Sequence, residues 1–170
     1  MSHTLVALME DKPGVLNRVS SLFRRRNYNI ESLSVGHSET DGISRMTVVV
    51  DGDEHIVGQV VTQLEKLINV TEVVNVSHTP AVTRELALIK VKAGPGSRSE
   101  IFELANVFRA RVVDVGANSL MIEITGPETR VNSLLGLLQP YGVVELARTG
   151  RVVMVRSGNG NDDGVSQDND

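Results

Sequence analysis

The hydrophobic and polar positions in the first half of the chain alternate between a strand-like and a helix-like period. Short runs rich in Val and Ile predict strands, and apolar residues spaced three and four apart predict the helices between them. The predicted strand, helix, strand, strand, helix and strand cover residues 3–10, 13–26, 28–37, 45–51, 53–68 and 70–79. This is the βαββαβ order of a ferredoxin-like unit.

The second half of the chain repeats the same order of elements. Strands are predicted at residues 86–93, 111–115, 119–125 and 143–155, and helices after residues 97–100 and from Pro127. We therefore predict an α+β fold of two tandem ferredoxin-like βαββαβ units. The predicted division is a first domain at 1–79, a second at 80–156 and an acidic tail at 157–170 that we expect to be disordered, with the linker at 77–84.

Local residues support the predicted helix starts. Pro13 and Pro127 suit the first position of a helix, where the missing N–H costs nothing. Ser97 and Glu100 have the spacing of a capping box.

A four-stranded sheet with both helices on one face leaves its other face and its edges to be covered, so we expect the chain to form a dimer.

Composition narrows the class of protein. With 3% aromatic residues and no Trp, the cores must be built from Val, Leu and Ile. The absence of Cys excludes disulfides and thiolate metal sites and fits a cytoplasmic protein. We see no signal peptide at the start and no apolar run of membrane-spanning length, so no membrane partner is expected.

Charge argues against a nucleic-acid partner. The net charge of −4 is matched by the four Asp residues of 157–170, a segment without Lys or Arg, so the rest of the chain is close to neutral. RNA-recognition modules share this order of elements but need aromatic residues on their central strands, and residues 45–50 and 111–115 contain none. No nucleophile with a neighbouring base and no cofactor motif stands out.

The loop that precedes the first helix is the candidate binding site. A helix start offers unpaired N–H groups and partial positive charge to a carboxylate, and Gly14 lets a ligand approach the backbone. Asp11 can accept from an ammonium group, and Asn29 both donates and accepts. Val15, Leu16 and Ile30 can line an apolar pocket. The candidate residues for a small zwitterion are Asp11, Pro13, Gly14, Val15, Leu16, Asn29 and Ile30.

Structural interpretations of these features stay open at this stage. An Asp, Pro and Gly before a helix are also typical of an ordinary strand-to-helix turn. The arginines at 24–26 stabilise the negative end of a helix or contact a partner. The four His residues, His3, His37, His55 and His78, lack metal-ligand spacing.

Several strings of residues closely resemble the regulatory (small) subunit of acetolactate synthase. They lie at 10–16, 26–33, 44–47, 63–68, 84–91 and 108–114, and the resemblance covers residues 3–156. It implies an N-terminal ACT domain, a second ferredoxin-like domain, and a homodimer that binds a branched-chain amino acid, typically valine, between two ACT domains. Residues 11–16 of one chain would meet Asn29 and Ile30 of the other.

The resemblance also implies a function without chemistry of its own. The chain would activate a catalytic subunit, which would hold thiamine diphosphate, FAD and magnesium, and would confer feedback inhibition on it. Many family members carry Asn where this chain has Asp11, and the second unit lacks an equivalent of Tyr28, Asn29 and Ile30, so no effector site is expected there. The alternative is a free-standing amino-acid sensor that acts on another partner, such as a transcriptional regulator.

Overall fold

The computed structural model describes residues 1–158. The acidic tail is predicted to be disordered, but its residues 159–170 lie outside the described part of the chain.

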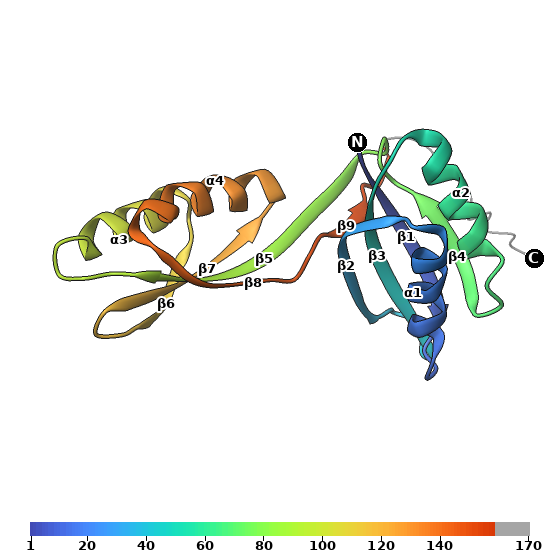
Figure 1. The fold of residues 1–170 in the computed structure, drawn as a ribbon, viewed down its shortest axis with the longest axis horizontal. Helices are drawn as coiled ribbons and strands as arrows, with labels where there is room; N and C mark the ends of the chain where they lie inside the picture. Colours follow the sequence, from blue (N-terminus) through green and yellow to red (C-terminus); the bar gives the residue numbers. More distant parts are fainter. Residues whose placement is uncertain (159–170) are drawn as a thin grey trace, which may run out of the picture.

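The first unit has the predicted order of elements. They are β1 (Ser2–Glu10), α1 (Val15–Arg26), β2 (Asn29–His37), β3 (Ile43–Asp51), α2 (Glu54–Glu65) and β4 (Val70–Asn75). The strands pair antiparallel in the order β2-β3-β1-β4, so the edges of this sheet are β2 and β4 (Figure 1).

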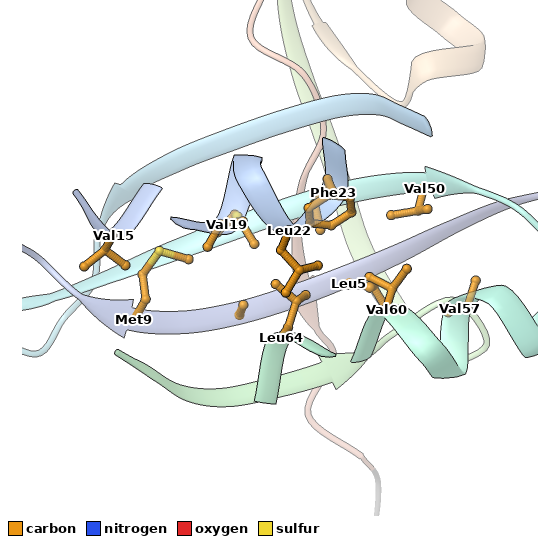
Figure 2. Packing of buried hydrophobic residues seen from close by; sticks show 13 residues of the cluster. Leu5, Met9, Val15, Val19, Leu22, Phe23, Val50, Val57, Val60 and Leu64 are labelled. Carbon is orange, nitrogen blue, oxygen red and sulfur yellow. The ribbon is translucent and has the colours of Figure 1, made fainter. Parts of the chain in front are cut away.

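The core of this unit lies between the sheet and its two helices. Successive strand side chains point to opposite faces, so alternate residues of β1 and β3 meet the helices. The buried set is Leu5, Ala7, Met9, Val15, Val19, Leu22, Phe23, Met46, Val48, Val50, Val57, Val60 and Leu64. Figure 2 shows side chains of α1 and α2 converging on those of the strands. The apolar spacing that predicted both helices is thus the spacing of their buried faces.

The second unit repeats this architecture with one added strand. Its elements are β5 (Ala81–Lys92), α3 (Arg98–Val107), β6 (Arg111–Val115), β7 (Ser119–Gly126), α4 (Glu128–Leu138), a short 3₁₀ turn (Gln139–Tyr141), β8 (Val143–Arg148) and β9 (Val152–Val155). The order β6-β7-β5-β8 matches that of the first sheet, and α3 and α4 cover its core. The predicted fold class is confirmed.

Strand β5 extends from one unit to the other (Figure 1). Residues 85–92 pair with β7, whereas residues 81–84 pair with β9. The prediction of a linker at 77–84 is therefore wrong for its second half. The partner of residues 81–84 comes from the far end of the second unit, and no local pattern reveals such a pairing.

The ribbon formed by residues 81–84 and β9 packs against the first unit. Val153 of β9 is buried with Val6 and Val76, and Ala81 packs beside them. Arg45 of β3 donates to the carbonyl oxygen of Val153 at 2.9 Å. These contacts cover part of the sheet face that the helices of the first unit leave open.

Helix starts differ in detail from the predictions. Helix α1 begins at Val15, because the φ of +86° at Gly14 lies in the left-handed region and is not a helical backbone angle. Pro127 likewise precedes its helix, with extended backbone. The predicted capping box is wrong: Ser97 makes no side-chain cap within residues 1–158, and Glu100 accepts from the Tyr141 hydroxyl at 2.7 Å instead.

Candidate functional site

The loop from Asp11 to Gly14 is held at the end of β1 by backbone hydrogen bonds. The Asp11 N–H donates to the Gly42 carbonyl at 2.8 Å, and the Arg18 N–H donates to Gly14 at 3.0 Å. Gly14 is the N-cap of α1 and brings no side chain over the helix start. Since the first N–H groups of a helix lack intrahelical partners, this end of α1 can accept an anion.

The first turn of α1 carries no side-chain charge that would repel an anion. It contains no acidic residue, and the three basic residues Arg24, Arg25 and Arg26 lie in the last turn, at the other end of the helix. Lys12 turns back toward the sheet and pairs with Glu10, Nζ to Oε2 at 2.8 Å. This hydrogen bond, followed by one from Asn69, lowers the pKa of Glu10, so that carboxylate stays charged and neutralises Lys12.

The Asp11 carboxylate has a partner that sequence reasoning missed. Its Oδ2 lies 3.1 Å from Nδ1 of His37, the last residue of β2, and both side chains are exposed. Glu10 pairs with Ile43 and His37 with Ser44, so β3 brings the ends of β1 and β2 to the same end of the sheet. The predicted ammonium acceptor therefore sits beside an imidazole, and the strand register was the signal that could have placed it there.

The apolar candidates divide by exposure. The Val15 side chain is 5% exposed and belongs to the core of its own unit (Figure 2), as does Ile30 at the core margin. Leu16, the second residue of α1, is 44% exposed. Leu16, rather than Val15, is therefore the apolar side chain that a ligand could contact at the start of α1.

Asn29 and Ile30 lie at the opposite end of the first sheet. Asn29 pairs with Asp51, which also pairs with Ser2 at the start of β1. The nine residues of β1 separate this end from the loop at Asp11, a span of roughly 30 Å at 3.4 Å per residue. One chain therefore does not bring its two groups of candidate residues together.

Strand β2, which carries Asn29 and Ile30, is an irregular edge strand of the first sheet. The pairing register with β3 shifts between Ile30 and Ser32. Leu33 and Val35 pair with the core residues Val48 and Met46, so they lie on the helix face, yet they are 37% and 42% exposed. An exposed edge with apolar side chains is suited to pairing with another strand.

A cleft of about 370 Å³ opens between the two units, beside β2 and away from the helix start. We call it the junction cleft, and its lining includes Glu31, Ser32, Glu85, Glu128, Arg148 and Arg151. Arg148 pairs with the buried Glu85, and Arg151 pairs with Glu128. None of the candidate effector residues lines it. Its members come from distant positions with no shared motif, so sequence reasoning did not find it.

Two further properties of residues 1–158 bear on the function. No group of three or more His, Asp or Glu side chains is arranged to hold a metal ion in this part of the chain. The described helices are too short or too polar to cross a membrane.

Both units match known family models. Residues 5–72 match the AHAS small subunit-like ACT domain, and residues 84–157 match the small subunit of acetolactate synthase. The chain is 54% identical over 156 residues to a probable acetolactate synthase small subunit of Archaeoglobus fulgidus, covering 92% of this chain and 98% of that one. It is 49% identical over 159 residues to the acetolactate synthase small subunit of Mycobacterium bovis, covering 94% and 95%.

A solved structure shares the same fold. The acetolactate synthase small subunit of Thermotoga maritima matches with a TM-score of 0.85 and 40% identity, covering 93% of this chain and 99% of that one. With 93% of this chain covered, the likeness extends through both units. The chain therefore belongs to the acetolactate synthase small-subunit family, with an ACT domain as its first unit.

Proposed function

We propose that this chain is the non-catalytic regulatory subunit of an acetolactate synthase. It activates the catalytic subunit and makes it sensitive to feedback inhibition by a branched-chain amino acid, with valine as the expected effector. The observation that carries the proposal is the 49–54% identity to small subunits over nearly the whole chain. In this assignment the catalytic subunit holds thiamine diphosphate, FAD and magnesium, and both proteins work in the cytoplasm.

The effector site of this proposal is completed by a second copy of the chain. Two β2 edges pairing antiparallel about an axis near Leu33 would bring residue 29 of each chain beside residue 37 of the other. His37 contacts Asp11, so Asn29 of one chain would lie near the helix-start loop of its partner. The separation of roughly 30 Å within one chain and the exposed apolar side chains of Leu33 and Val35 support this arrangement.

An amino-acid effector fits the chemistry of the two half-sites. Its carboxylate would bind the N–H groups at the start of α1, its ammonium group would meet Asp11, and Asn29 would hydrogen-bond to either charged group. Leu16 and Ile30 would contact the aliphatic side chain. Burial of that side chain contributes roughly 1.5–3 kcal/mol and each hydrogen bond to a charged group roughly 1.5–3 kcal/mol. These sums reach the about 5.5 kcal/mol that a dissociation constant near 0.1 mM requires.

Reconstitution with the cognate catalytic subunit tests the proposal. The purified chain alone is expected to convert no pyruvate, to raise the turnover of the catalytic subunit when added, and to make that turnover fall with added L-valine, L-leucine or L-isoleucine. Calorimetry on the chain alone should show binding of at least one of the three. Effector binding without any effect on the catalytic subunit would instead indicate a sensor with a different partner, and no binding at all would refute the sensor assignment.

A further inference from the structure

Arg151 lies where the chain leaves the second sheet and returns to the first. It follows β8 and precedes β9. Its backbone N–H donates to Oγ of Ser32 on β2 at 3.0 Å, and its Nη1 donates to Oγ1 of Thr4 on β1 at 2.8 Å. Its Nη2 forms an ion pair with Glu128, the first residue of α4. One half-buried residue therefore contacts two strands of the ACT domain and a helix of the second unit.

The neighbouring glycine fixes how closely this segment approaches β2. Gly150 has a φ of +80°, and a Cβ placed on it would lie 2.6 Å from Oγ of Ser32 and 3.4 Å from the Leu33 carbonyl oxygen. A larger residue at 150 would push the chain away from the strand. The contact with Ser32 thus depends on the absence of a side chain at this position.

Ser32 follows the irregular point of the strand that carries one half of the effector site. It is two residues beyond Ile30, immediately after the register shift between β2 and β3. The register shift interrupts the regular ladder, so β2 departs from regular strand geometry next to the residue that meets Arg151. A ligand that pulls on Asn29 and Ile30 would move Ser32 directly.

The attachment of β9 to the ACT domain does not depend on Arg151 alone. Val153 is buried against Val6 and Val76, and Arg45 binds the Val153 carbonyl oxygen. The apolar contact joins β9 to the first unit, whereas Arg151 connects Ser32 of β2 with Glu128 of α4. The junction cleft lies beside these bonds.

We propose that Arg151 is a positioning residue that couples effector binding on β2 to the orientation of the second unit, through Ser32 on one side and Glu128 on the other. The inference rests on the proposed regulatory function. It names the residues that would link the effector site to the second unit within one chain. Coupling requires two arrangements of the two units that the effector binds with unequal affinity. In this proposal the contacts of Arg151 are formed in one arrangement and broken in the other.

Paired calorimetry measures this coupling. The affinity for L-valine is determined for the regulatory subunit alone and for its complex with saturating catalytic subunit. By linkage, the ratio of the two dissociation constants is the coupling factor, typically about 5- to 150-fold. We expect a wild-type ratio of at least about fivefold, and a ratio within about twofold of one for Arg151→Gln, with little change in the affinity of the isolated subunit.

Matched variants separate coupling from folding. Arg111→Gln changes an exposed arginine of β6 and should keep the wild-type ratio. Ser32→Ala removes only the acceptor of the Arg151 N–H and should lower the ratio even if Arg151→Gln does not fold. Arg151→Lys keeps the charge but cannot form the forked contacts of Arg, so this variant should also lower the ratio.

The outcomes distinguish this inference from the proposed function. A wild-type ratio preserved in both Arg151→Gln and Ser32→Ala would overturn the role of Arg151 while leaving effector binding and activation intact. Absence of valine, leucine and isoleucine binding in the wild-type chain would overturn the proposed function and the inference with it.

Discussion

Asp11 and His37 show how single residues define one half of the candidate site. Their contact joins the loop before α1 to the end of β2. The resemblance marked Asp11 as a departure from the Asn of many relatives, and the structure adds that its carboxylate already contacts an imidazole. An incoming ammonium group would share that carboxylate or displace His37, so we expect these two residues to influence effector recognition together.

Asn29→Ala should weaken effector inhibition while preserving activation. Loss of a hydrogen bond to a charged ligand group costs roughly 1.5–3 kcal/mol, which is roughly a 10- to 100-fold rise in the half-inhibitory concentration. Inhibition curves of the reconstituted complex measure it, with Asn106→Ala on the exposed face of α3 as control. An unchanged inhibition curve for Asn29→Ala would remove this residue from the site.

Glu10 should make the stability of the ACT domain depend on acid pH. The hydrogen bond from Lys12, with one from Asn69, lowers its pKa in the folded chain. A lowered folded-state pKa contributes stability above the unfolded value, and this contribution is lost as pH falls through the folded pKa. Thermal unfolding should therefore show a higher midpoint for wild type than for Glu10→Gln at pH 7, with the gap closing as the pH falls below the ordinary glutamate pKa of about 4.3. A gap that is constant across this range would contradict the role of this carboxylate.

Among the elements, β9 shows the limit of local prediction. The strands and helices with a clear period were predicted from sequence, since the period reports the buried face of each. Residues 81–84 and 152–155 were not predicted to pair, because their partners are distant in sequence and their burial against Val6 and Val76 depends on how the units pack. The predicted details of two helix starts were wrong as well. Gly14 takes a left-handed backbone conformation before α1, and Ser97 makes no side-chain cap on α3 within the described residues.

Val153→Ala should destabilise the chain by about 1–3 kcal/mol, since it removes buried methyl groups from the cluster with Val6 and Val76. Val152→Ala is the matched control, because that side chain is 46% exposed on the same short strand. Denaturant titration of both variants measures the difference. Equal midpoints for the two would show that β9 does not anchor the units.

At the scale of the whole molecule, two units with the same topology are joined so that the second reaches back to the first. The tandem arrangement could be predicted from the repeated pattern, and the candidate residues from the resemblance. The junction at Ser32 and Arg151 could not, because it combines residues 119 positions apart in a geometry that no motif encodes. The edge of β2 remains the surface that we expect a second chain to cover.

Val35→Lys should weaken the dimer, because a charged side chain on an exposed edge opposes strand pairing. Val115→Lys places the same change on β6, an edge of the second sheet, where the side chain is 56% exposed. Sedimentation over a range of concentrations should show dissociation of the first variant only. Dissociation of the Val115→Lys variant alone would move the dimer contact to the second unit.

A mixed dimer tests most directly the central claim that the effector site is divided between two chains. Asp11→Ala removes, at an exposed loop position, the carboxylate proposed to meet the ammonium group, and Asn29→Ala removes a residue of the opposite half-site. Dimers of either variant alone have no intact site, whereas a dimer with one chain of each has one. Calorimetry on dimers purified through two different tags should show one L-valine bound per mixed dimer at wild-type affinity. Mixed dimers that bind no better than either parent would contradict a site shared between chains.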